Sequence, residues 1–201
     1  MTASIERTAP VRAELRLATR WLHDATEVVS GDFVSSGSIE RYGDVLAGFH
    51  GGWAPLERSV DAWHERYDVL DWPQRRRVDA LEADLRALGR TPARPTGAGL
   101  VGRVSLARGL GWLYVLEGST LGAATLAHRL DRQPDRSWPR QFLDSGARPL
   151  RRWPRYLQVL EASVVDDSDR ADARRGAIEA FTLVHDALAT VVPRSRAAAR
   201  P

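Results

Sequence analysis

Four polar residues near the start of the chain have the types and spacing needed to bind a metal and an anion together. Arg16, Thr19, His23 and Glu27 recur at intervals of three and four residues. On a helix with about 100° per residue they share one sector of about 80°, beside the apolar face of the same helix. A polar row that borders a core face can line a pocket. The alternative is a solvent-exposed stripe with an i,i+4 His–Glu pair.

The chemistry available to this row is specific. The neutral imidazole of His23 can ligate iron through one ring nitrogen and donate a hydrogen bond from the other to Glu27, one turn later. Arg16 lies two turns earlier, about 10 Å along the helix axis, where its guanidinium can bind an anion. A large, flat metal complex with carboxylates at one edge would satisfy both ends of the row.

The composition excludes several other kinds of chemistry. The 201 residues include no cysteine, which excludes a disulfide scaffold, a thiolate nucleophile and every Cys-based metal site. All 29 basic residues are arginine, which excludes Schiff-base chemistry and a P-loop lysine. The formal net charge of +3 comes from dispersed arginines and carboxylates, so nucleic-acid binding is not indicated.

The pattern of apolar residues and caps predicts helices almost throughout and no convincing strand. We expect a single all-α domain over residues 10–193, with disordered tails at 1–9 and 194–201. The predicted helices span about 10–29, 38–67, 71–89, 100–130, a short segment near 140–144, 154–163 and 168–192.

The sequence indicates neither a membrane-spanning helix nor a signal peptide. Gly109–Ala127 is a run of 19 residues with a single charge at Glu117, but Gly, Ser, Thr and Ala dilute its apolarity. Since a central carboxylate is costly in a bilayer, we expect a buried core helix and no membrane span. The first nine residues lack the apolar stretch of a signal peptide, so a cytoplasmic location is expected.

At this point the chain resembles a known family. The motif Thr19-x-x-x-His23-x-x-x-Glu27, preceded by Arg16, is similar to the proximal helix of haem oxygenases, in particular the bacterial ones associated with bacteriophytochromes. Further matching blocks follow in the family's order and together cover about residues 12 to 188: Phe33, Gly37, Tyr42, Trp53 to Glu57, Pro73 to Leu85, Tyr114 to Gly122, and Ala180-Phe181.

The resemblance implies a haem-oxygenase-like multi-helical fold in which haem is both cofactor and substrate. The family's reaction uses O2 and external electrons to convert haem into biliverdin, carbon monoxide and ferrous iron. By resemblance, His23 is the axial ligand of the iron and Glu27 is its hydrogen-bond partner. The neutral histidine suits this chemistry, because a cysteine thiolate would favour O–O cleavage.

The resemblance also places the segment from Tyr114 to Ala124 on the other, distal face of the haem. Gly118 and Gly122 lack a Cβ and let the backbone approach a flat ligand, and with Ser119 they are the expected catalytic residues. The alternative role for the glycines is close helix–helix packing. Glu117 is expected to point away from the haem, since it is offset from Gly118 by about 100°.

Other haem contacts are expected around this core. Thr19, Tyr114 and Phe181 are expected to border the haem, and Arg16 to bind one propionate. Arg155 is the expected second propionate contact, with Arg152 in reserve. The chain departs from many family members at Ala123-Ala124, where they carry Gly and Gln, and at Ser119, where some carry a carboxylate of the distal water network.

The resemblance also implies protein partners. A ferredoxin or flavodoxin is the expected electron donor, and a bacteriophytochrome is a possible acceptor of biliverdin. The arginine run at residues 75–77 indicates either a solvated turn or a docking face for an acidic donor. His50, His64, His128 and His185 are expected at the surface or in the core, and Trp112 or Trp153 near the pocket.

Two other functions stay open from the sequence. A haem carrier or sensor would keep His23 without cleaving the ring. A thiaminase-like relative would use the same helices without haem, but His23, Glu27 and the absence of cysteine argue against it.

Overall fold

The computed structural model of the chain describes residues 9–192, apart from 32, 35–36, 93–99, 101, 103, 133–136 and 148–151. Within these ranges it contains seven α-helices, one short 3-10 helix and no strand, which confirms the expected all-α class. The predicted tails fall almost entirely outside the described residues. The elements are α1 (Val11–Ser30), α2 (Ile39–Tyr67), η1 (Trp72–Gln74), α3 (Val78–Ala87), α4 (Leu106–Asp131), α5 (Gln141–Ala147), α6 (Arg152–Ser163) and α7 (Asp167–Val191).

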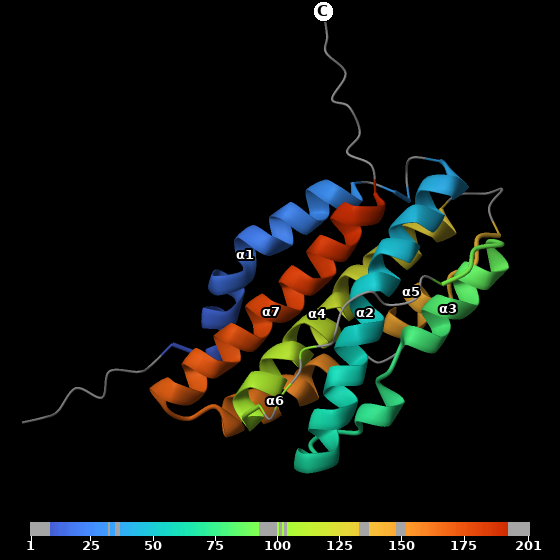
Figure 1. The fold of residues 1–201 in the computed structure, drawn as a ribbon. Helices are drawn as coiled ribbons and strands as arrows, with labels where there is room; N and C mark the ends of the chain where they lie inside the picture. The colour runs from blue at the N-terminus through green and yellow to red at the C-terminus, as the bar shows by residue number, and fades with distance from the viewer. Residues whose placement is uncertain are drawn as a thin grey trace, which may run out of the picture.

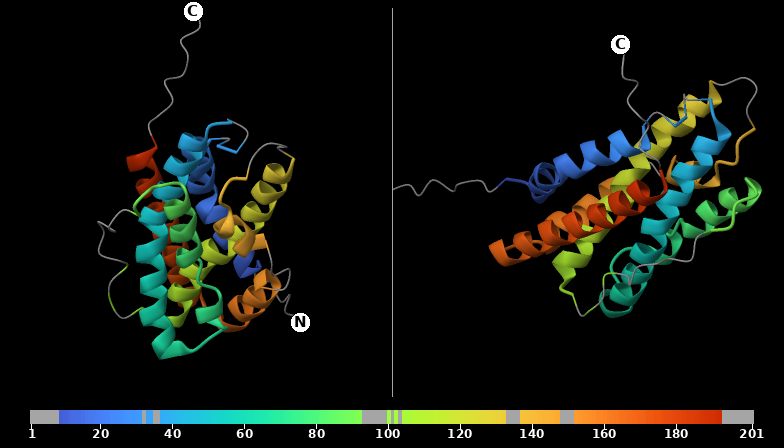
Figure 2. Two further views of the ribbon diagram at one scale, coloured as in Figure 1. Left: turned by 90° about the vertical axis from the view of Figure 1, so that its right-hand side faces the viewer. Right: turned by 45° about the horizontal axis from the view of Figure 1, so that its top comes forward.

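Helix α7 is the centre of the arrangement, because it packs against α1, α2 and α4 (Figure 1). Helices α1, α4 and α7 run in the same direction and α2 runs in the opposite one, as all views show (Figure 2). The short α5 packs on α3 and α4, while α6 packs on α4 and α1. The core between these helices is rich in large aromatic side chains, including Tyr42, Trp53, Trp72, Trp112 and Tyr156.

Side-chain caps fix the starts of three long helices. The Ser38 hydroxyl accepts from the backbone N–H of Arg41 at α2, and the Asp166 carboxylate caps α7 in the same way. At α4 the Ser105 hydroxyl accepts from the Arg108 N–H (3.1 Å) and donates to Asp172 of α7 (2.7 Å). Helix α4 therefore starts at Leu106, six residues later than the sequence pattern predicted.

The predicted helix over residues 71–89 is wrong in its first half. The structure has η1, a break, and then α3 from Val78. The break forms because the Glu57 carboxylate of α2 accepts the backbone N–H groups of Arg77 (2.7 Å) and Val78 (3.3 Å) and so caps α3 from a distance. Arg75 and Arg77 are buried and Arg76 is exposed, so the run at 75–77 is not a solvated turn.

Several glycines are required by helix packing. A Cβ on Gly111 of α4 would overlap the Ala173 carbonyl oxygen of α7, and one on Gly176 of α7 would overlap the Arg108 carbonyl oxygen of α4. A Cβ on Gly52 of α2 would lie 2.6 Å from Cα of Val184. The backbones of α2 and α4 thus approach α7 too closely for any side chain at these positions.

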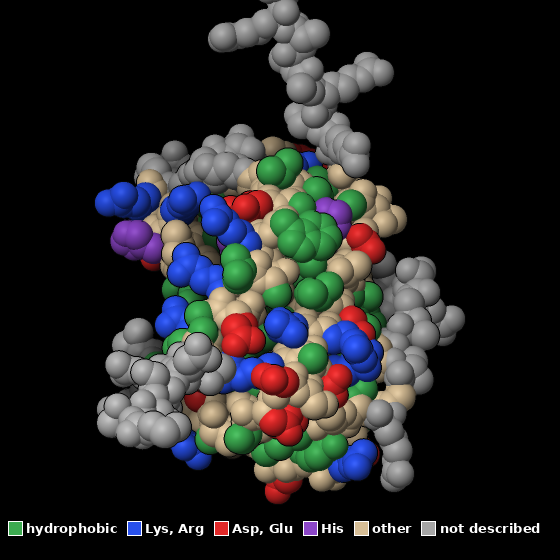
Figure 3. Space-filling model, turned by 90° about the vertical axis from the view of Figure 1, so that its left-hand side faces the viewer, with side chains coloured by type: hydrophobic (Ala, Val, Ile, Leu, Met, Phe, Trp, Pro, Cys, Tyr) green, Lys and Arg blue, Asp and Glu red, His purple; other side chains and the backbone are tan. Residues whose placement is uncertain are grey.

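The surface carries mixed charge. On the face shown in Figure 3, which includes α1, arginine side chains are interspersed with carboxylates and hydrophobic groups. Leu17, Trp21 and Val28 are the largely exposed apolar residues of α1. In the described part of the chain, no helix combines the length and apolarity that a bilayer span requires.

The packing glycines lead to a first prediction. Gly111→Ala should lower the free energy of unfolding by about 1–3 kcal/mol, because the new methyl group must displace the backbone of α7. Urea unfolding followed by circular dichroism measures this difference. Gly122→Ala on the same helix is the matched control, since a Cβ there meets nothing within 4 Å and alanine favours the helix. Equal stability of the Gly111→Ala variant and the wild type would contradict the packing role.

Candidate functional site

His23 lies on α1 with its ring held between carboxylates and an aromatic edge. Its Nδ1 is 3.7 Å from Glu27 Oε1 and 3.8 Å from Asp24 Oδ1. The ring of Phe181 on α7 meets the His23 ring edge-to-face, with centroids 6.2 Å apart. Because the carboxylates face Nδ1, the opposite nitrogen, Nε2, is left for a metal. The His23 side chain is 57% exposed, so this nitrogen is accessible.

The three side chains form a group that could hold a metal ion. Ligand atoms of His23, Asp24 and Glu27 lie within 4.8 Å of one another, and all three residues are exposed. Exposed carboxylates beside a histidine also suit the role of hydrogen-bond acceptors that fix the ring.

Thr19 and Tyr114 connect α1 to α4. Thr19 is buried, its hydroxyl donates to the Leu15 carbonyl (2.8 Å), and its side chain lies near enough to Tyr114 to lower the pKa of that phenol. Burial raises the pKa of Tyr114, while Arg12, Arg16 and Thr19 lower it. Since α1 and α4 run in the same direction, one further turn along each helix brings His23 and Gly118 to a similar level.

The two glycines of this part of α4 are not explained by helix packing. A Cβ on Gly118 would meet only the ring edge of Trp153, at 3.6 Å, which is an ordinary contact. A Cβ on Gly122 would meet nothing within 4 Å. They differ in this from Gly111, where packing on α7 leaves no room. The absence of side chains at Gly118 and Gly122 instead leaves space along α4, after the turn where Tyr114 lies near α1.

Cationic and aromatic groups collect at the Thr19 end of the row. The Arg12 guanidinium lies over the Trp153 ring, 5.9 Å from its centroid, and Trp153 in turn lies 5.8 Å from the Tyr114 ring. Arg16 is exposed on the same helix and acts on Tyr114 through its charge. Arg12 was not among the residues expected at the site, although at one turn before Arg16 it falls in the same helical sector.

The structure does not group the other two expected arginines with this end. Arg155 is exposed and donates to the side-chain oxygen of Gln158 on the next turn of α6 (3.5 Å). Arg152 donates to the Gln74 carbonyl (2.6 Å) and so holds α6 to η1. Of the two tryptophans expected near the pocket, Trp153 is beside the row, whereas Trp112 lines a different cavity.

Polar side chains of α4 beside the glycines in sequence contact the segment between η1 and α3. Glu117 Oε2 is 2.9 Å from Arg75 Nη1, and both side chains are 3% exposed. Burial raises the pKa of Glu117, and Arg75 opposes this increase. The Ser119 hydroxyl accepts from Arg77 (2.9 Å) and donates to the Leu116 carbonyl (2.6 Å). Glu117 is therefore paired with the segment between η1 and α3.

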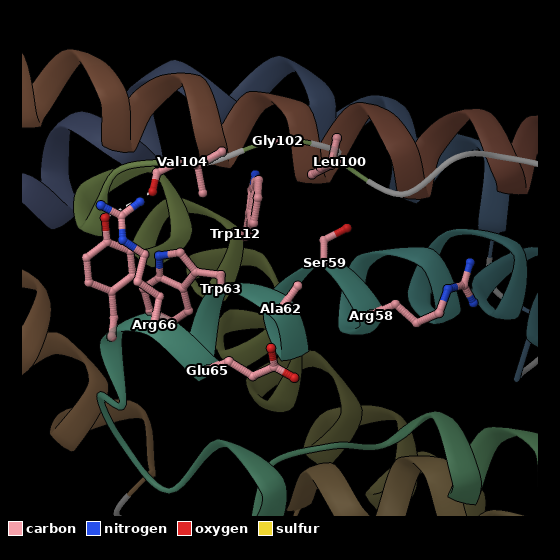
Figure 4. A pocket seen from close by; sticks show the side chains of 11 residues that line it. Arg58, Ser59, Ala62, Trp63, Glu65, Arg66, Leu100, Gly102, Val104 and Trp112 are labelled. Carbon is pink, nitrogen blue, oxygen red and sulfur yellow. Dashed lines mark hydrogen bonds between the residues drawn. The ribbon is translucent and has the colours of Figure 1, made fainter.

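A separate cavity of about 600 Å³ is lined by the C-terminal part of α2 and the start of α4 (Figure 4). None of the expected site residues lines it. Its aromatic side chains are used in holding the chain before α4, since Trp63 donates to the Ser105 carbonyl (3.2 Å) and Tyr67 to the Val104 carbonyl (3.1 Å). We do not assign the site to this cavity.

Comparisons with known proteins agree on one family. A family model described as heme oxygenase matches residues 9–190. The chain is 34% identical over 152 residues to a heme oxygenase of Xanthomonas campestris pv. campestris (strain 8004), covering 75% of this chain and 90% of that one. It is 32% identical over 119 residues to heme oxygenase PigA of Pseudomonas aeruginosa, covering 57% of this chain and 59% of PigA.

Solved structures show the same fold. The NO- and CO-bound heme oxygenase of Neisseria meningitidis superposes with a TM-score of 0.75 at 21% identity, over 95% of this chain and 96% of that one. The heme oxygenase of Leptospira interrogans gives a TM-score of 0.67 at 17% identity, over 90% and 100% of the two chains.

The burial of Glu57 predicts that the free energy of unfolding depends on pH. Burial raises the pKa of Glu57 to about 7, although the N–H groups of Arg77 and Val78 and the charges of Arg76 and Arg77 lower it. The protonated form therefore stabilises the fold below the unfolded value of about 4.5, and this stability is lost as the pH rises through about 7. Between these limits, the free energy of unfolding of wild type relative to Glu57→Gln should fall, at most by about 1.4 kcal/mol per pH unit.

Urea unfolding of both proteins between pH 4.5 and 8 measures this difference. Using the difference cancels the titration of other carboxylates. A difference that stays constant over the whole range would contradict the assignment to Glu57.

Proposed function

Since the chain belongs to the haem oxygenase family, we propose that it binds haem between α1 and α4, with His23 as the axial ligand of the iron. It is an enzyme that degrades haem. Haem bound in such an enzyme supplies the iron at which O2 is reduced and the ring carbon that is oxidised, and biliverdin, carbon monoxide and ferrous iron are released. The finer assignments that follow concern this chain's own residues.

The observation that carries the proposed position is the pair Gly118 and Gly122. They lie on α4 with room for a side chain that the sequence does not supply, while other glycines of α4 are fully explained by packing. A flat ligand lying against the backbone of α4 accounts for both absences. Tyr114, one turn before Gly118, ties this face to α1 through Thr19.

Each residue of the row has a role in this arrangement. The Glu27 carboxylate lies 3.7 Å from Nδ1 of His23, where it can orient the ring so that Nε2 faces the iron. The Phe181 edge restricts rotation of the His23 ring. Arg16 and Arg12 supply the positive charge for the propionates, and Arg12 replaces Arg155 as the second expected contact because it lies beside Trp153 and Tyr114.

The distal side combines small groups with a withdrawn acid. Ser119 is oriented by Arg77 and by the Leu116 carbonyl, and Glu117 is held by Arg75. A carboxylic acid close to bound oxygen would favour splitting of the O–O bond over attack on the ring. The pairing of Glu117 with Arg75 keeps that acid away from the face formed by Gly118 and Gly122.

The partners are proposals of the same kind. Electrons come from an external donor of the ferredoxin or flavodoxin class, and a bacteriophytochrome is a possible acceptor of the biliverdin. A non-degrading haem carrier or sensor on the same fold is the second candidate function, favoured only by the exposure of His23.

Ring cleavage decides between these functions. Purified protein is mixed with haemin, and the Soret band is recorded; oxygen and a reductant are then added. The appearance of the biliverdin spectrum supports the enzyme. A ferric or ferrous-oxy haem that persists under these conditions supports the carrier.

The axial ligand is tested by His23→Ala. Loss of the imidazole should abolish or shift the ligated ferric spectrum, and added imidazole should restore it by occupying the vacated position. His185→Ala, one turn beyond Phe181 on α7, is the matched control and should leave the spectrum unchanged. If His23→Ala keeps the wild-type spectrum, the axial role belongs to another histidine.

The glycine face is tested by Gly122→Leu. The added side chain fills the space proposed for haem, so the Kd for haemin should rise at least about tenfold, in line with typical overpacking costs. Ala124→Leu, exposed on another side of α4, is the control and should bind haemin like the wild type. Unaltered haemin affinity in Gly122→Leu, with its circular dichroism spectrum intact, would place the haem elsewhere.

A further inference from the structure

Arg77 is a buried cation at the meeting point of α2, α4 and α5. Its side chain is 3% exposed. The guanidinium donates to the Ser119 hydroxyl of α4 (2.9 Å), to the Phe142 carbonyl of α5 (2.9 Å) and to the Ser145 hydroxyl of α5 (3.4 Å). One side chain therefore connects α4 to α5 through a hydrogen bond from each of its three nitrogens.

The acceptors around this guanidinium are all neutral. Its faces lie against aromatic rings, 4.2 Å from the Phe142 centroid and 5.7 Å from that of Trp53. Among the ion pairs of the described residues, none includes Arg77, whereas the neighbouring Arg75 pairs with Asp71 and Glu117. Burial lowers the pKa of Arg77 to about 10, so the charge persists at neutral pH.

The surroundings are built to hold this charge. A Cβ on Gly146 of α5 would lie 2.7 Å from Arg77 Nη2 and 2.8 Å from the Ala123 methyl group of α4. Glycine at this position therefore admits the guanidinium between the two helices. The charges of Glu57 and Glu117 raise the pKa of Arg77, but neither carboxylate lies at ion-pair distance from its guanidinium. Burying a charge that has no directly paired carboxylate is costly, and hydrophobic residues of similar volume commonly replace such groups without loss of stability. Joining α4 to α5 does not by itself require a cation.

The position of Ser119 shows where the charge acts. Ser119 directly follows Gly118 and lies three residues before Gly122, so the group that Arg77 contacts borders the glycine face of α4. We propose that Arg77 positions this stretch of α4 through Ser119 and gives the glycine face a positive potential that favours anions bound there. This inference rests on the proposed placement of haem against that face.

The consequence for the reaction is electrostatic. Reduction of oxygen adds negative charge on the distal side, and a fixed cation in a water-poor site stabilises such charge without reorganisation. Across about 10 Å, with an effective dielectric constant of about 20, a unit charge changes the affinity for an anion by about tenfold. Arg77 acts through Ser119 and its field, so it is a positioning residue.

The test compares an anionic and a neutral ligand of the haem complex. Ferric complexes of wild type, Arg77→Gln, Arg77→Met and Arg77→Lys are titrated with azide, and the ferrous complexes with carbon monoxide. Loss of the charge in Arg77→Gln and Arg77→Met should raise the azide Kd about tenfold and leave the carbon monoxide affinity within about twofold. Arg77→Lys keeps the charge and should retain wild-type azide affinity.

A spectroscopic readout separates the charge from a structural role. The positive potential should lower the C–O stretching frequency of the carbon monoxide complex, so this frequency should rise in Arg77→Gln and Arg77→Met but not in Arg77→Lys. Arg76→Gln, which removes a neighbouring and partly exposed arginine, is the matched control and should leave both readouts unchanged. Arg77→Met keeps the test available if Arg77→Gln does not fold, because it fills a similar volume without charge.

The outcomes are distinct. If wild type and the neutral variants all form a Soret band with haemin and bind azide equally well, the role of Arg77 is overturned, while the proposed function stands. Equal weakening of azide and carbon monoxide binding would show that Arg77 only supports the helix, and would overturn the electrostatic part. A wild-type protein that forms no Soret band with haemin would overturn both this inference and the proposed function.

Discussion

The contact between the backbones of α4 and α7 is the constraint on which the site depends. Gly111 and Gly176 each face a carbonyl oxygen of the opposite helix, so the two helices can meet in only one register. That register fixes Tyr114 relative to Phe181, because each lies one turn or so beyond the contact on its own helix. Since α1 packs on α7, the His23 ring then meets the Phe181 edge, and Thr19 meets Tyr114.

The same residue type serves two purposes along α4. In the first turns, glycine allows protein backbone or a tryptophan ring to approach, as at Gly109 beside Trp63 and Gly111 beside α7. Two turns later, a Cβ on Gly118 would make only an ordinary contact with Trp153, and one on Gly122 would meet nothing within 4 Å. The first turns of α4 therefore pack against other parts of the protein, whereas its later turns leave space for a ligand. Spacing in the sequence does not separate these purposes, because only the neighbouring helix shows which glycine is already in contact.

Local pattern was sufficient to predict most of the fold. The all-α class and the approximate helices followed from apolar periodicity and caps, and the row on α1 followed from four residues within twelve positions. Arg12 was equally visible in that sector, but its value depends on Trp153, which only the folded chain brings near. The expectation for Arg155 relied on a loose match in an arginine-rich stretch, where the register of a helix decides which side chain faces inward.

Where the sequence misled, the cause was a contact between distant segments. The run at 75–77 has the composition of a solvated turn, but the Glu57 carboxylate, about 20 residues earlier, caps α3 and turns two of the three arginines inward. The delayed start of α4 likewise depends on Ser105 binding Asp172 of α7. Propensity cannot anticipate such bonds, because their partners are set by tertiary packing.

The inward turn of the arginines also gives α4 two different electrostatic sides. Arg75 pairs directly with Glu117, which removes the acid of α4 from the glycine face, whereas Arg77 donates to the neutral Ser119 hydroxyl and forms no direct ion pair. The arginine run therefore both withdraws a proton donor and supplies a fixed positive charge. A haem carrier requires only an iron ligand and an apolar pocket. Neither the pairing of Glu117 with Arg75 nor the contact of Arg77 with Ser119 would increase its affinity for the haem ring. Chemistry in which oxygen gains negative charge and the O–O bond must not be protonated too early would use both.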